Sequence, residues 1–129
     1  MDLRERDQFL APARQAVFST VSPEGRIHSV PVWYEYEGGS FRVLTGRGSV
    51  KHRNLQHNPR ASMCIDDGRF GYVSAEGAVQ IEDRVTRDER LVLHTRYRGP
   101  RDAAAVVSLG GHEAMVRIVL RPDHWITSW

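Results

Sequence analysis

The sequence has no long apolar run: none approaches the roughly 20 consecutive apolar residues that a helix needs to cross a bilayer. Its first residues are charged and no apolar segment follows them, so we expect no signal peptide. Cysteine is almost absent, and Cys64, being alone, has no partner for an internal disulfide. A chain without disulfides fits a reducing compartment. Together these features predict a cytoplasmic protein with no membrane span.

Lysine is also scarce, since Lys51 is the only one among 18 basic residues. The others are arginines, whose planar guanidinium suits phosphate and carboxylate groups. The formal net charge is +2 and the pI is near 9.0, which is a weak electrostatic footprint for nucleic acid. Aromatic residues do not alternate with cations along any one strand. Binding of single strands by a small barrel stays an alternative, but we predict no nucleic-acid partner.

Several catalytic motifs are missing. There is no Gly-Lys-Ser/Thr at Walker spacing, which disfavours nucleotide triphosphate hydrolysis, and no Gly-x-Ser-x-Gly elbow, which disfavours an esterase. The six histidines lack His-x-x-x-His spacing and no cysteine pair accompanies them, so we predict no metal site. Cys64 stands between Met63 and Ile65, and we expect a small buried residue there, not a nucleophile.

What is present is a succession of strand-like runs separated by turns. The 129 residues, 40% hydrophobic and 26% charged, have the size and composition of a single globular domain, residues 1–129. The pattern predicts six strands, at 16–21, 27–36, 40–45, 61–66, 72–81 and 114–120. It predicts helices at 2–10, 50–57, 86–97 and 103–109, and a tail at 124–129. We therefore expect a mainly β protein whose antiparallel sheet closes as a small barrel.

Two residues interrupt the predicted strands. Pro31 lacks an N–H, so it requires an edge strand, a bulge or a point where another group approaches. One interpretation is a simple edge. The other is a break in pairing that leaves the backbone from Val30 to Trp33 free for a ligand. Gly77, inside the long run 72–81, predicts a bulge or bend.

The most distinctive stretch is 45–60, which follows a strand and turns through Gly46 and Gly48. Ser49 is a good N-cap for the short helix that follows, and a helix N-terminus favours anions. The stretch also concentrates hydroxyl, amide and cationic side chains, namely Thr45, Arg47, Ser49, Lys51, Arg53 and Asn54. Its residues therefore predict a site for a phosphate or another compact anion, with a solvated basic turn as the alternative.

The order of these motifs resembles the flavin/deazaflavin oxidoreductase superfamily. The resemblance rests on Val30-Pro31-Val32-Trp33-Tyr34, on the run from Thr45 through Gly46, Ser49, Lys51 and Arg53-Asn54-Leu55 to Asn58-Pro59-Arg60, and on Tyr72-Val73-Ser74-Ala75-Glu76-Gly77. It covers nearly the whole chain and is nearest to the actinobacterial branch that uses the deazaflavin coenzyme F-420. The implied fold is the split β-barrel of the pyridoxamine-phosphate oxidase-like flavoproteins.

This resemblance implies a cofactor phosphate held at Thr45, Ser49, Lys51 and Arg53, with Asn54 close by. It implies that the tricyclic ring lies against the second strand, at Val30, Pro31, Val32 and Trp33. It also implies a homodimer with the cofactor between the subunits, and an enzyme that moves a hydride to or from a small electron-poor substrate. FMN, haem or another tetrapyrrole stays an alternative ligand, and a non-catalytic deazaflavin carrier stays an alternative function.

Overall fold

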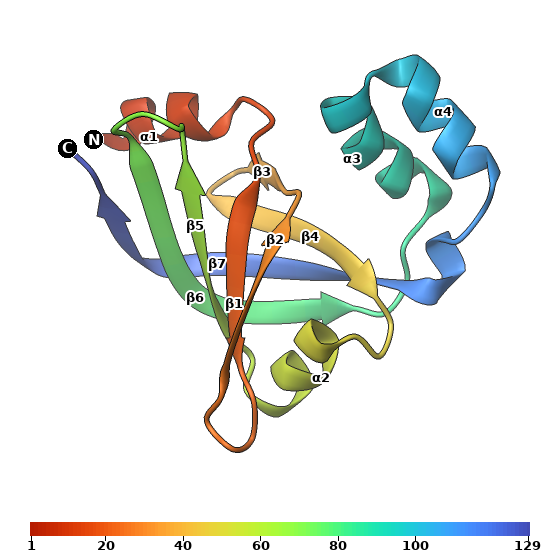
Figure 1. Cartoon of the computed structure of the whole chain (residues 1–129), viewed down its shortest axis with the longest axis horizontal. Helices are drawn as coiled ribbons and strands as arrows, with labels where there is room; N and C mark the ends of the chain where they lie inside the picture. The colour runs from red at the N-terminus through yellow and green to blue at the C-terminus, as the bar shows by residue number, and fades with distance from the viewer.

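The computed structural model describes residues 1–129 and contains seven strands and four α-helices (Figure 1). The strands are β1 (Ala16–Val21), β2 (Ile27–Val32), β3 (Glu35–Glu37), β4 (Ser40–Gly46), β5 (Arg60–Asp66), β6 (Tyr72–Glu82) and β7 (Met115–Thr127). The helices are α1 (Leu3–Leu10), α2 (Val50–His57), α3 (Arg87–Arg98) and α4 (Pro100–Ser108), and a 3-10 turn, η1, spans His112–Ala114. No helix has the length and apolar character needed to span a membrane.

All seven strands form one antiparallel sheet in the order β2-β1-β5-β6-β7-β4-β3. The sheet curls into a half-open barrel, so the prediction of a split β-barrel is confirmed (Figure 1). Alternate residues of each strand point inward, as Ala16, Phe18 and Thr20 of β1 do. The apolar core inside the barrel also contains Phe9 and Leu10, through which α1 covers one end. Helix α2 packs against β1 and β4 near the other end.

The predicted second strand, 27–36, is in fact two strands. Pairing of β2 with β1 ends at Val32, and β3 begins at Glu35 and pairs with β4 at the other end of the sheet. The chain changes edges here because Tyr34 turns into the core, where its hydroxyl donates to the Leu10 carbonyl at 3.1 Å. Pro31 pairs only with Val17 of β1, so its interpretation as an edge residue is confirmed.

Strand β7 is longer than predicted. The sequence pattern ends it at Leu120 because Arg121 and Pro122 follow, yet β7 continues to Thr127. Beyond Leu120, β7 pairs with β6 alone. Pro122 therefore has a neighbouring strand on one side only, and its missing N–H breaks no hydrogen bonds to a strand on the other side. Opposite Pro122 the register shifts between Glu76 and Gly77, which confirms the predicted bulge. Residues 124–127 of the predicted tail 124–129 are therefore part of the sheet.

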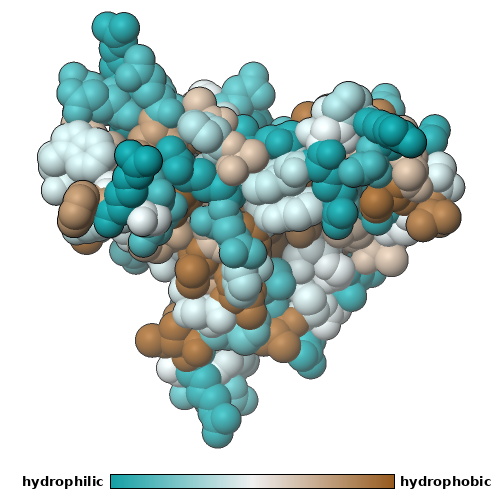
Figure 2. All heavy atoms as spheres, turned by 45° about the horizontal axis from the view of Figure 1, so that its top comes forward, coloured by the Kyte–Doolittle hydropathy of each residue, from teal (hydrophilic) through white to brown (hydrophobic).

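The outer face of the sheet carries an uncharged row across five strands. Val17 pairs with Pro31 on one side and with Cys64 on the other, and the row continues through Ser74 to Ile126. The prediction of a buried Cys64 is wrong, because Met63 and Ile65 take the inward positions and leave the thiol exposed. Figure 2 shows apolar residues gathered over the lower stem of the molecule, where the β1–β2 hairpin lies.

Helices α3 and α4 form a hairpin outside the barrel (Figure 1). Gly99 has φ of 84° and joins them without a loop, since its N–H bonds the Thr95 carbonyl while Pro100 already begins α4. The predicted helix 103–109 thus starts three residues earlier, because Pro100 is a favourable first helical residue. Helix α3 is fixed to the outer face of β7 by the ion pair of Glu89 with Arg117 at 3.0 Å.

Candidate functional site

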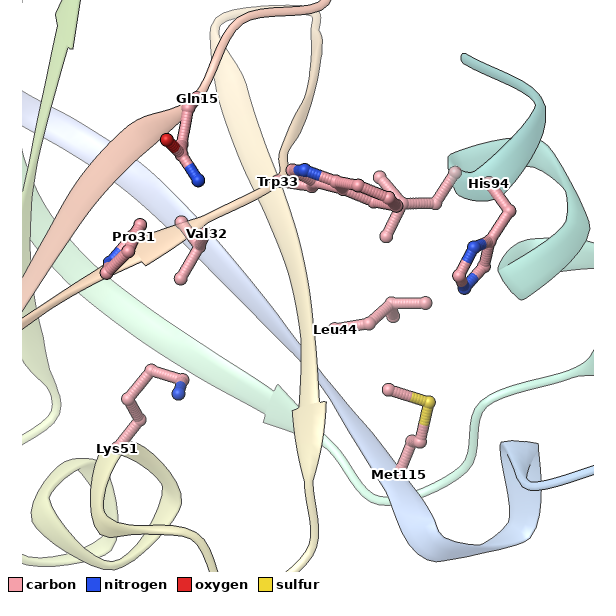
Figure 3. A pocket seen from close by; sticks show the side chains of 9 residues that line it. Gln15, Pro31, Val32, Trp33, Leu44, Lys51, His94 and Met115 are labelled. Carbon is pink, nitrogen blue, oxygen red and sulfur yellow. The ribbon is translucent and has the colours of Figure 1, made fainter. Parts of the chain in front are cut away.

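A cavity of about 310 Å³ lies where the sheet fails to close, between the free edge of β2 and strand β4 (Figure 3). We call it the seam cavity. Its volume is within the range of small-molecule sites, roughly 300–1,000 Å³. Its walls are mainly apolar and contain no carboxylate. The nine lining residues are Gln15, Pro31, Val32, Trp33, Leu44, Lys51, Leu93, His94 and Met115.

Lys51 supplies the only formal charge in this lining, from the first turn of α2 (Figure 3). Its ammonium makes no hydrogen bond or ion pair with the protein, and burial lowers its pKa. The backbone N–H groups of Val50 and Lys51 belong to the first helical turn, where no intrahelical acceptor exists. An unpartnered, half-buried cation beside two free amides is an arrangement that favours an anion.

The loop before α2 is held by its own side chains. The Ser49 hydroxyl caps the helix by accepting from the His52 N–H at 3.2 Å, and it lies 3.1 Å from the Thr45 hydroxyl. The His52 Nδ1 accepts from the Gly48 N–H at 2.9 Å. Gly48 has φ of 79°, a conformation that glycine adopts without strain. These contacts fix the turn that presents Lys51 to the cavity.

Trp33 forms the outer wall of the seam cavity against α3. Its indole stacks on Tyr97, with ring centroids 4.5 Å apart and planes 4° apart. The Tyr97 hydroxyl donates to the Arg14 carbonyl at 2.6 Å and accepts from the Tyr34 N–H at 3.0 Å. Burial raises the pKa of Tyr97. The stack and these hydrogen bonds therefore tie α3 to the segment before β1 and to the segment that links β2 and β3.

Arg96 strengthens this attachment with hydrogen bonds to four backbone carbonyls. Its Nε donates to Tyr34 at 3.0 Å, one terminal nitrogen donates to Ala11 at 2.7 Å, and the other donates to Pro12 at 2.9 Å and to Leu10 at 3.3 Å. We call this group the Arg96 bridge. It connects α3 to the end of α1 and to the β2–β3 link, so the outer wall of the cavity is attached to two separate segments of the chain.

The structure brings four of the ten sequence-predicted site residues to the seam cavity, namely Pro31, Val32, Trp33 and Lys51. Their role in binding a cofactor stays a prediction. Thr45 and Ser49 lie in the adjoining turn, where their hydroxyls contact one another. Arg53 is exposed on α2.

The remaining three predicted residues face elsewhere. Val30 packs on the core, and Asn54 is buried, donating to the Thr20 hydroxyl at 3.0 Å. Arg47 turns away to the Asp83 carbonyl, at 2.6 Å, beside a separate cavity of about 550 Å³. The abundance of cations and hydrogen-bond donors in 45–60 thus overstates how many of its side chains can contact one ligand.

Sequence reasoning missed five lining residues: Gln15, Leu44, Leu93, His94 and Met115. Strand alternation could have identified Leu44. Phe41, Val43 and Thr45 point inward, so Leu44 must lie on the other face of β4. His94 and Leu93 had no such signal, since they reach the cavity only after α3 docks. Burial, followed by the positive charges of Arg90 and Arg98, lowers the pKa of His94. The structure groups no three His, Cys, Asp or Glu side chains as metal ligands.

Residues 3–125 match the family model described as pyridoxamine 5′-phosphate oxidase. A solved structure described as an F-420 reductase is 25% identical, with a TM-score of 0.77, over 93% of this chain and 94% of that chain. A conserved hypothetical protein from Mycobacterium tuberculosis is 24% identical, with a TM-score of 0.85, over 99% and 84%. An FMN-binding protein from Nostoc punctiforme, related to pyridoxamine 5′-phosphate oxidase, is 16% identical, with a TM-score of 0.64, over 95% and 78%. No curated protein matches the sequence.

Proposed function

Because the chain belongs to the pyridoxamine 5′-phosphate oxidase family, we propose that it is an oxidoreductase that binds the deazaflavin coenzyme F-420. In this proposal it transfers a hydride between the coenzyme and a small electron-poor organic substrate. The unpartnered ammonium of Lys51 in the seam cavity is the observation that carries the proposal. The 25% identity to a structure described as an F-420 reductase supports the deazaflavin over FMN. The expected cytoplasmic location stays a prediction.

The residues of the seam cavity fit such a cofactor. Lys51 and the first-turn amides of α2 would hold the phosphate, and Pro31, Val32 and Trp33 would support the flat ring from the free edge of β2. Leu44 and Met115 would keep water from the ring. When bound, the deazaflavin supplies the hydride chemistry. The protein would then bind the cofactor, orient it and exclude water from the ring.

Fluorescence titration of the purified protein tests this function. We expect F-420 to bind with micromolar or tighter affinity, and we expect the loaded protein to reduce at least one member of a panel of quinones, unsaturated carbonyls and biliverdin. Tight binding of FMN without binding of F-420 would contradict the cofactor assignment. Tight binding of F-420 without turnover of any acceptor would favour a carrier over an enzyme.

We also propose that the protein is a homodimer that pairs through the uncharged row on the outer face of the sheet. Val17 and Ile126 in this row are 47% and 51% exposed, and side chains of this kind gain from burial against a partner. Pro31 belongs both to this row and to the lining of the seam cavity. Pairing through this face would therefore place the partner beside the cavity.

Val17→Glu tests the homodimer, because a glutamate within the row would bury an unpaired charge on pairing. We expect light scattering after size-exclusion chromatography to give a dimer for the original protein and a monomer for the variant. Leu109→Glu is the matched control, since Leu109 is 87% exposed and follows α4, away from the row. A monomeric original protein, or a variant that stays dimeric, would contradict this interface.

A further inference from the structure

The imidazole of His94 reaches from α3 into the seam cavity, on the opposite side of the cavity from Lys51 (Figure 3). Its ring stands edge-on to Trp33, with centroids 5.6 Å apart and planes at 78°. Trp33 is itself held by the stack on Tyr97, so the position of the imidazole is set by packed neighbours. A polar ring thus projects into a wall that is otherwise apolar at this end.

A hydrogen bond from Arg98 decides which nitrogen of His94 carries the proton. The Arg98 Nε lies 3.2 Å from the His94 Nδ1. A guanidinium only donates hydrogen bonds, so Nδ1 must be the acceptor and the proton of the neutral ring is on Nε2. Burial and the charges of Arg90 and Arg98 favour the neutral ring by lowering the pKa of His94. The hydrogen bond to Nδ1 is the one that the His94 side chain makes within the protein, so Nε2 has no protein partner.

We propose that the His94 Nε2–H donates a hydrogen bond to a substrate oxygen that gains negative charge during hydride transfer. This inference rests on the proposed function, with reduced deazaflavin as the hydride donor. In the proposed function Lys51 holds the cofactor phosphate at the other side of the cavity. His94 is therefore free to contact the substrate. His94 is then a catalytic residue, and it favours acceptors whose reactive carbon is conjugated to a carbonyl group.

The reaction balances for an unsaturated carbonyl. The β carbon gains the hydride, the electron pair of the carbon–carbon double bond moves towards the oxygen, and the resulting enolate oxygen accepts the Nε2–H bond. Water then protonates the α carbon, and the hydroxide that remains is neutralised by the proton that a reduced deazaflavin would release together with its hydride, so that one hydride and one proton reach the substrate in all. His94 remains neutral throughout, because it stabilises charge without giving up its proton, as electrostatic stabilisation requires.

Two variants separate the donor from the shape of the ring. His94→Phe keeps a planar ring against Trp33 without the N–H, and His94→Gln keeps an N–H. With cyclohexenone as acceptor we expect His94→Phe to lower kcat/KM by roughly tenfold, the effect of losing one hydrogen bond, and His94→Gln to recover part of the loss. With a tetrazolium cation, which presents no oxygen, the loss caused by His94→Phe should be much smaller than the loss with cyclohexenone. The affinity for F-420 should likewise fall less than kcat/KM for cyclohexenone.

Equal losses with both acceptors, or a matching loss of F-420 affinity, would overturn this role for His94. If the original protein turns over neither acceptor, the proposed function has failed, and the tautomer of His94 is tested directly. Nitrogen-15 NMR of the protein without cofactor should show the proton on Nε2 at neutral pH, and Arg98→Ala should give a mixture of both tautomers. A proton found on Nδ1 in the original protein would overturn the inference without any assay of activity.

Discussion

Gly77→Ala should destabilise the protein by about 3 kcal/mol, the upper part of the usual range for forcing extra atoms into a packed site. A Cβ at this position would overlap the carbonyl oxygen of Arg121 and lie 2.8 Å from the Cα of Pro122. Both neighbours are backbone atoms of β7, so relief requires the strand to move away. We expect the melting temperature to fall by roughly 10 °C for a domain of this size.

Gly46→Ala is the matched control for this result. A Cβ at Gly46 meets no atom within 4 Å, and its backbone does not adopt a positive φ. We therefore expect its melting temperature in calorimetry to stay close to that of the original protein. Equal melting temperatures for Gly77→Ala and the original protein would mean that β7 does not pass Gly77 as closely as the bulge requires.

Lys51→Ala should weaken the binding of F-420 by about tenfold, the expected loss of one charge-assisted contact of about 1.5 kcal/mol. Lys51 is the only cation lining the seam cavity and has no competing partner in the protein. The side chain is partly exposed, so solvent reduces the effect below that of a fully buried pair. The measurement is the dissociation constant from fluorescence titration at low and at high salt.

Arg53→Ala and Arg47→Ala are the controls on neighbouring cations. Arg53 is exposed on α2, and Arg47 contacts Asp83 outside the seam cavity, so neither variant should change the affinity as much as Lys51→Ala. A larger loss of F-420 affinity in either control would indicate that the anion site is not at Lys51. Unchanged affinity in Lys51→Ala would remove the observation on which the proposed function depends.

The sequence predicted most of the sheet because strand alternation and turn residues are local signals. It failed at Pro122, where the outcome depends on how β7 pairs with Gly77 of β6 at the register shift. It also failed at Cys64. Alternate residues of β5 face the core, and a shift of the alternation by one residue decides whether Met63 or Cys64 is buried. At both residues the outcome is decided by contacts with a neighbouring strand. The local sequence does not show these contacts.

The candidate site divides in the same way. Lys51 and the segment Pro31 to Trp33 were predicted because a glycine turn, a helix cap and a strand proline are visible in the chain itself. The cavity wall at His94 could not be predicted, because it exists only where α3 docks through Glu89 and Arg117. Composition also misplaced Arg47, whose partner Asp83 lies 36 residues further along the chain.

The Arg96 bridge has a consequence for folding kinetics. Its bonds close loops of 62 to 86 residues, and contacts that are far apart in sequence form after the loop entropy has been overcome by other pairings. Interactions absent from the folding transition state mainly slow unfolding. The bridge should therefore have little influence on how fast the sheet assembles. It should instead set how long the outer wall of the seam cavity stays in place once the chain has folded.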